Sequence, residues 1–163
     1  MYLNKTKTLY LFKYVNCAAW LVSKECIRKV GGFDPLFFHY GEDENYCQRV
    51  HYHGYKIGVS TIAKIRHDRD ERNGEMRAEF KSQNVKRDEL VRLADINNLY
   101  YSEEIQLLQK QYFRFMRSRL IRADFKGSRF YLDIYIAYLK MAKDVSVSRQ
   151  LNIKGGSWLD GKN

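Results

Sequence analysis

The sequence predicts an α/β fold in which a few short strands precede a helical C-terminal region. Residues 1–75 contain short apolar stretches that alternate with polar residues, and glycines separate these stretches from two short segments with helical spacing. In residues 76–163, apolar residues recur every three or four positions, which is typical of amphipathic helices. We therefore expect two regions, 1–75 and 76–163, with the second packing on the first.

The first elements follow from local patterns. Residues 1–13 alternate weakly between polar and apolar and predict a strand, and residues 14–22 predict a second β-compatible stretch. Ser23 is the predicted N-cap of a helix over residues 24–30, with Ile27 and Val30 facing inward and Gly31 ending it. A first strand without its neighbours favours pairing with another chain, so we expect a homo-oligomer as one outcome.

The centre of the sequence is the stretch 31–49, which combines a glycine turn, an aromatic run and an acidic helix start. The aromatic run is too dense for a solvated loop and predicts the floor of a crevice. Three carboxylates, Glu42, Asp43 and Glu44, begin a predicted helix over residues 42–53, with Gly54 after its end. These acids either complement the helix dipole or place a general base at the rim of a crevice.

Beyond this helix, residues 55–59 alternate as a strand and residues 62–65 form a second apolar piece. Three helical stripes follow, one around residues 90–97, one over 105–120 with Ser102 as its predicted cap, and one over 130–145 with Ser128 as its cap. Residues 146–163 give little signal, and Trp158 is the expected anchor of this tail.

Several of these segments resemble, in the same order, the acceptor-side segments of the inverting, non-processive family 2 glycosyltransferases, and among them the rhamnosyltransferases. The similar segments are NCAAWL at 16–21, VGGFD at 30–34, FFHYGED at 37–43, Arg49, and Arg66 with His67. The resemblance covers residues 14–72 and implies part of a GT-A fold. It implies transfer of a sugar from a nucleotide-diphosphate donor to a hydroxyl of a glycan or lipid-linked acceptor, in the synthesis of a bacterial-type surface polysaccharide.

The resemblance also implies roles for individual residues. Asp43 corresponds to the catalytic base, with Glu42 supporting it or contacting the acceptor, and His67 corresponds to a ligand of the divalent cation, Mn²⁺ or Mg²⁺. The expected sugar contacts are Asn16, Trp20, Phe37, Phe38 and Tyr40, and the expected diphosphate contacts are Arg66 and Arg69. From the residues alone, Trp20 is equally a core aromatic, Arg49 is by default solvated, and the two arginines equally belong to a solvated loop.

One departure from the family matters more than the matches. In the family, a nucleotide-binding half with the Asp-x-Asp that holds the metal precedes the segment at which this sequence begins. Asp68-Arg69-Asp70 fits the Asp-x-Asp pattern, but it lies after His67, so we treat this match as a coincidence. We expect a C-terminal part of an enzyme that is inactive alone and binds the cation only with the donor half. The alternative is a non-catalytic module that binds a glycan, a membrane or a partner through basic helices.

Composition limits the setting. With 45% hydrophobic residues the chain can bury a core, while no segment is apolar for long enough to cross a membrane and no signal peptide is evident. We expect a cytoplasmic protein, or one peripheral to the inner face of the membrane. Three cysteines suit a reducing compartment, and Cys47 is expected in the core rather than in a zinc site with His51 and His53.

The net charge of +10 predicts attraction to polyanions, and basic residues concentrate between Lys110 and Arg129. The candidate partners are a nucleotide-diphosphate sugar and an anionic membrane surface. Nucleic acid is not expected, because no helix-turn-helix, zinc-finger or ribonucleoprotein signature is present.

Overall fold

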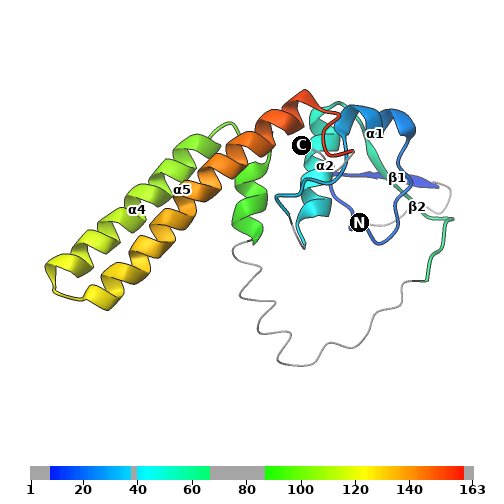
Figure 1. The fold of residues 1–163 in the computed structure, drawn as a ribbon. Coiled ribbons are helices and arrows are strands. Elements are labelled where there is room, and N and C mark those ends of the chain that lie inside the picture. The colour runs from blue at the N-terminus through cyan, green and yellow to red at the C-terminus, as the bar shows by residue number, and fades with distance from the viewer. Residues whose placement is uncertain (1–7, 38–39, 67–86, 160–163) are drawn as a thin grey trace.

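The computed structural model describes residues 8–37, 40–66 and 87–159. The chain forms a small mixed α/β body from which a helical hairpin extends (Figure 1). The body contains β1 (Leu9–Phe12), α1 (Lys24–Val30), α2 (Glu42–Tyr52) and β2 (Ile57–Ser60), and the hairpin consists of α4 (Tyr101–Ile121) and α5 (Phe125–Lys154). A further helical segment, 87–94, lies between the two parts. The α/β class is thereby confirmed.

The described sheet has two strands. β1 and β2 pair antiparallel, with Leu9 opposite Ser60 and Phe12 opposite Ile57. The strands predicted within residues 1–13 and 55–59 are therefore confirmed, at Leu9–Phe12 and Ile57–Ser60. Residues 14–22, which the sequence marks as β-compatible, do not form a strand. The side-chain oxygen of Asn16 accepts a hydrogen bond from the Ala18 N–H at 3.1 Å, and the backbone carbonyl of Asn16 accepts one from the Trp20 indole at 3.0 Å. This local turn replaces the extended conformation.

The apolar piece at 62–65 is also not a strand. It has no paired strand beside it among the described residues, and Ile62 and Ile65 are 74% and 70% exposed. The alternating pattern therefore does not mark a buried face in this segment.

The ends of the two short helices are where the sequence predicts them. The Ser23 hydroxyl accepts the Cys26 N–H at 3.1 Å and caps α1. Gly31, with φ of +93°, ends α1, and Gly54, with φ of +82°, follows the end of α2. In α1 the inward residues are Cys26 and Val30, whereas Ile27, predicted to face inward, is 37% exposed.

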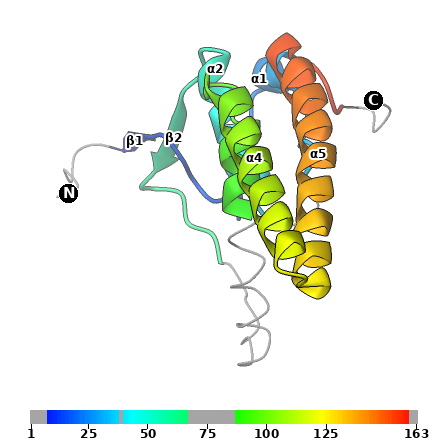
Figure 2. The same cartoon turned by 90° about the vertical axis from the view of Figure 1, so that its left-hand side faces the viewer.

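The long helices exist as predicted, but their caps differ. Figure 2 shows α4 and α5 lying side by side as the two arms of the hairpin. α4 begins after Tyr100 and α5 after Asp124, whose carboxylate accepts the Gly127 N–H at 2.9 Å, so the two predicted serine caps lie inside the helices. α5 continues to Lys154, and about half of the tail that gave little signal is therefore helical.

Among the described residues, three small clusters of buried side chains form the core. One joins α1 to α2, a second packs Phe37 against the segment 87–94, and the third joins that segment to the hairpin. Their buried members are Cys26, Val30, Tyr46 and Val50 in the first, Phe37, Val91 and Ala94 in the second, and Leu93, Ile105 and Val145 in the third. The segment 87–94 thus connects the body to the hairpin.

The C-terminal tail packs against the glycine turn that follows α1. The Gly32 N–H donates to the Ser157 carbonyl at 2.9 Å, and the Gly156 N–H donates to the Lys29 carbonyl at 3.0 Å. A Cβ on Gly31 would lie 2.1 Å from the Ser157 oxygen, so the close approach requires glycine. The Trp158 indole donates to Asn152 at 2.8 Å, which confirms that Trp158 anchors the tail.

Candidate functional site

Helix α2 is the element around which the candidate site is built. Asp43, Cys47 and His51 recur every four residues and therefore share one face. This face contacts the loop that follows β1. The Tyr14 hydroxyl donates to Asp43, the Cys47 thiol contacts the Val15 carbonyl at 3.8 Å, and a ring nitrogen of His51 lies 2.9 Å from the Lys13 carbonyl. Cys47 is buried, as predicted.

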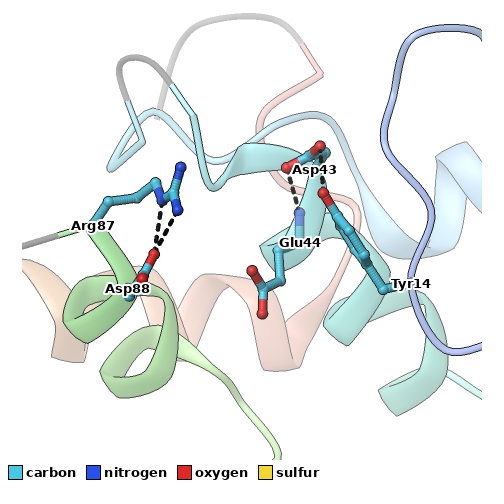
Figure 3. Close-up of polar contacts among 5 residues, drawn as sticks. All are labelled: Tyr14, Asp43, Glu44, Arg87 and Asp88. Atoms are coloured by element: carbon cyan, nitrogen blue, oxygen red, sulfur yellow. Dashed lines mark hydrogen bonds and ion pairs between the residues drawn. The ribbon is translucent and has the colours of Figure 1, made fainter. Parts of the chain in front are cut away.

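Asp43, the predicted general base, lies in the first turn of α2 and is 8% exposed. Its Oδ2 accepts a hydrogen bond from the Tyr14 hydroxyl at 2.9 Å and its Oδ1 accepts one from the Glu44 N–H at 2.8 Å (Figure 3). Burial, and then the hydrogen bond to Asp43, raises the pKa of Tyr14 to about 12, so the phenol remains a donor at neutral pH. The carboxylate is thus fixed in direction at the positive end of the helix dipole.

Glu42 lies beside Asp43 with one oxygen unpaired. Within the described part of the chain, its buried Oε2 has no hydrogen-bond partner, and the same is true of the Gln48 Oε1 farther along α2. Burial raises the pKa of the Cys17 thiol, and the charges of Asp43 and Glu42 raise it further, which places both carboxylates near the turn at 16–20. With the Oδ1 of the buried Asn45, three acceptor oxygens on α2 therefore have no hydrogen-bond partner among the described residues.

Two shallow hollows lie alongside α2, with volumes of about 440 and 450 Å³. Glu44, Gln48 and Asp95 line both of them. The first hollow is also lined by Lys13, Tyr14, Cys47, His51 and Asn97. The second is also lined by Arg87, Asp88, Val91 and Arg92. Asp43 lines neither hollow, but its partner Tyr14 and its neighbour Glu44 line the first, so the hollow begins one residue away from the predicted base.

Each hollow is lined by only one more acidic than basic side chain, Glu44 and Asp95 against Lys13 in the first, and Glu44, Asp88 and Asp95 against Arg87 and Arg92 in the second, although the chain as a whole is strongly basic. Partial burial raises the pKa of Glu44, and the nearby carboxylates of Asp88, Asp43 and Asp95 raise it further, while Arg87 opposes them. Arg87 is paired with Asp88 at 2.6 Å and is turned toward it in Figure 3. This surface suits hydroxyl groups or cations better than phosphate groups.

The predicted sugar-contact residues are distributed unevenly. Trp20 is partly buried and lies against Phe33 and Tyr46, with ring centroids 6.1 and 5.6 Å away, and packs on the core between α1 and α2. Phe37 is buried against Val91 and Ala94 and lines neither hollow. Asn16 is exposed, and Tyr40 is partly buried. The sugar contacts of these residues stay predictions.

The remaining predicted residues give little geometry. Arg66 is exposed at the end of the described segment 40–66. Phe38, His67 and Arg69 lie outside the described residues.

Arg49 is not solvated, and that interpretation is wrong. Its side chain is fully buried, and its guanidinium donates to the Val30 carbonyl at 3.2 Å, the Gly32 carbonyl at 2.6 Å and the Asn152 side chain at 3.1 Å. Burial lowers the pKa of Arg49 and the charge of Asp34 opposes this shift. Arg49 thus ties α2 to the glycine turn and to the end of α5.

The sequence reasoning missed Tyr14 and the polar end of α5. Ser148 and Asn152 both donate to the buried Asp34 carboxylate, at 2.5 and 2.7 Å. They continue the stripe of Tyr138, Met141 and Val145 at intervals of three and four residues. Polar residues at core positions of a stripe were the available signal for a buried network.

No group of three or more His, Cys, Asp or Glu side chains within the described ranges is arranged to hold a metal ion. His51 and His53 contact the carbonyls of Lys13 and Asn152 instead of sharing a site with Cys47. The described carboxylates alone therefore do not make a metal centre. In the described part of the chain, no helix combines the length and apolarity needed to cross a membrane.

The chain matches no protein-family model, no curated protein and no solved structure.

Proposed function

We propose that this chain supplies the acceptor-side part of an inverting glycosyltransferase of the family 2 type. The enzyme moves a sugar from a nucleotide-diphosphate donor to a hydroxyl of a glycan or lipid-linked acceptor in surface polysaccharide synthesis. The observation that supports this proposal is the environment of Asp43. Tyr14 and the Glu44 amide fix its carboxylate, and Glu42 offers an oxygen beside it that no described residue pairs.

In the proposed reaction, Asp43 accepts the proton of the acceptor hydroxyl as that oxygen forms its bond to the anomeric carbon. The bond from this carbon to the diphosphate oxygen breaks on the opposite side, and the configuration inverts. A carboxylate that is already held by two donors needs little reorganisation when the hydroxyl arrives. The unpaired Glu42 oxygen accepts a hydrogen bond from the acceptor and orients it.

The two hollows are consistent with this division of tasks. An acceptor glycan presents many hydroxyl donors, which match the carboxylates and the unpaired Gln48 oxygen along α2. When bound together with a donor-binding half, Mn²⁺ or Mg²⁺ would stabilise the charge of the departing diphosphate; His67 would be one of its ligands, and Arg66 and Arg69 would contact the diphosphate. The described residues carry out the proton transfer and hold the acceptor.

The test uses Asp43→Asn in an enzyme in which this chain is joined to its donor-binding half. We expect kcat for sugar transfer to fall by about 10²- to 10⁴-fold, because a general base contributes that much. Donor affinity, measured by calorimetry with the nucleotide sugar, should change by less than about threefold, since the base contacts the acceptor. Asp144→Asn, an exposed carboxylate on α5, is the control and should leave both quantities unchanged. Near-normal turnover of Asp43→Asn would remove the assignment.

The second candidate function is a non-catalytic module that binds through its basic helices. The exposed basic residues of the hairpin favour it. An immunoblot of the native product decides between the two. A band near 19.5 kDa means that the cell makes only this part, and a band the size of a complete transferase favours the enzyme.

A further inference from the structure

The tip of the α4–α5 hairpin exposes large apolar side chains. Ile121 is 78% exposed and Phe125 is 69% exposed, on either side of the short turn between the helices. Phe130 and Leu120, farther back along each helix, are 60% and 49% exposed. Figure 1 shows this tip, in yellow, at the end of the hairpin that points away from the body. No core cluster of the described residues includes any of these four side chains.

Positive charge surrounds this apolar tip. Residues 117–130 contain five basic side chains and one acidic side chain. The basic residues are Arg117, Arg119, Arg122, Lys126 and Arg129. The acidic residue, Asp124, caps α5 and is paired with Arg119 at 3.1 Å, and Arg129 is paired with Asp133 at 3.2 Å. Arg117, Arg122 and Lys126 have no ion pair among the described residues. The tip therefore combines a net positive charge with exposed apolar surface.

We propose that the hairpin tip docks on an anionic lipid membrane, with Ile121 and Phe125 inserted among the acyl chains and Arg122 and Lys126 at the headgroups. Apolar side chains gain free energy in the acyl region, and each basic residue near an anionic surface adds to the attraction. The phosphates of a nucleic acid would satisfy the charge but would leave the aliphatic side chains in water, so the membrane matches both properties. The proposal does not depend on the glycosyltransferase assignment.

The geometry allows the body to remain outside the membrane. α4 comprises 21 residues, and a helix of that length spans about 30 Å. Insertion of an apolar side chain reaches about 5–10 Å into the headgroup and acyl boundary. Contact through the tip alone thus leaves α2 and Asp43 in water, close to the membrane.

The test is co-sedimentation of the 163-residue chain with vesicles of phosphatidylcholine, with or without about 30% phosphatidylglycerol. We expect binding to the anionic vesicles and little binding to the neutral ones. Ile121→Ser with Phe125→Ser should weaken the partition coefficient at least about tenfold. Arg122→Ala with Lys126→Ala should weaken it about 30-fold and reduce its dependence on salt.

The matched control is Leu107→Ser with Leu139→Ser. These two leucines are 65% and 45% exposed on the same helices, but they lie about 20 Å back from the tip. This pair should bind vesicles as the unmodified chain does. Circular dichroism of every variant checks that the hairpin is still folded.

A second measurement locates the tip directly. The indole introduced by Phe125→Trp should be quenched by brominated acyl chains more than Trp20 and Trp158 of the unmodified chain. The proposal would be overturned if the chain bound neutral and anionic vesicles equally, or if the leucine control lost as much vesicle binding as the tip variants. It would also be overturned if the brominated lipids did not quench the introduced indole. Binding to a DNA oligonucleotide without binding to vesicles would also overturn it and would assign the tip to nucleic acid.

Discussion

Asn152→Ala tests whether the end of α5 holds the candidate site together. Asn152 is fully buried, and its amide contacts four side chains. The nitrogen donates to Asp34 at 2.7 Å and to Ser148 at 3.2 Å, and the oxygen accepts from Arg49 at 3.1 Å and from Trp158 at 2.8 Å. Alanine removes all four hydrogen bonds and leaves the two charged partners buried.

The expected magnitude follows from these partners. A hydrogen bond to a charged group contributes about 1.5–3 kcal/mol to stability, and Asn152 makes one to Asp34 and one to Arg49. Because bonds within one network are not additive, we expect a total loss of about 3–5 kcal/mol, which is also the typical cost of breaking a buried charge pair. Domains are stable by only about 5–15 kcal/mol, so the variant should be close to unfolding.

Asn152→Asp separates two explanations of this loss. Aspartate keeps the oxygen that accepts from Arg49 and Trp158, but it replaces the donor to Asp34 with a second negative charge. If the amide is needed as both donor and acceptor, aspartate should destabilise the chain about as much as alanine does. If only the contact with the arginine matters, aspartate should be neutral or stabilising.

The assay is urea unfolding followed by tryptophan fluorescence and by far-ultraviolet circular dichroism. Gln150→Ala, two residues away on the exposed side of α5, is the control and should change the free energy of unfolding by less than about 0.5 kcal/mol. A loss below about 1 kcal/mol in Asn152→Ala, or a loss equal to that of the control, would refute the reasoning.

Two further predictions test the glycine turn and the hollows along α2. Gly31→Ala should lower the thermal midpoint of unfolding by more than Gly54→Ala does. Both glycines have a positive φ, but only at Gly31 would a new Cβ clash, since it would lie 2.1 Å from the Ser157 backbone oxygen. Equal decreases of the midpoint in the two variants would contradict the packing of the tail. Glu44→Gln should raise the midpoint by about 1–2 °C at neutral pH, because a raised pKa means that the folded state disfavours the charged form. That gain should disappear as the pH falls through the folded pKa toward 4.5, and a gain that persists in acid would be contrary evidence.

The features that the sequence predicted correctly depend on neighbouring residues. Ser23 caps α1 through a contact three residues away, and Gly31 and Gly54 end their helices through their own backbone conformation. The long helices predicted from the apolar stripes are also present in the structure, because an apolar face repeated over many residues outweighs a single unfavourable position. Their caps were misassigned because Ser102 and Ser128 compete with Tyr100 and Asp124 within about one turn, where the pattern gives no preference.

The features that the sequence did not predict depend on distant residues. The burial of Arg49 requires Asn152, which is 103 positions away, and nothing near Arg49 in the sequence indicates a buried arginine. The orientation of the Asp43 side chain likewise depends on Tyr14, which lies in a stretch that the sequence marks only as β-compatible. Asn16 changes that stretch into a turn, and the propensity of its apolar neighbours gave no sign of it.

The contacts of Asp43 and the contacts of Arg49 lie on the same helix, α2. Asp43 lies on the face that contacts the loop after β1, and Arg49 lies on the face that contacts the glycine turn and Asn152. Because both residues lie on one helix, we expect a change in the contacts of Arg49 to shift Asp43 relative to Tyr14. The end of α5 is therefore expected to influence the orientation of the carboxylate without contacting it. An enzyme that lacks residues 146–159 should lose activity even with an intact Asp43, and activity tests of Asp43 require the complete tail.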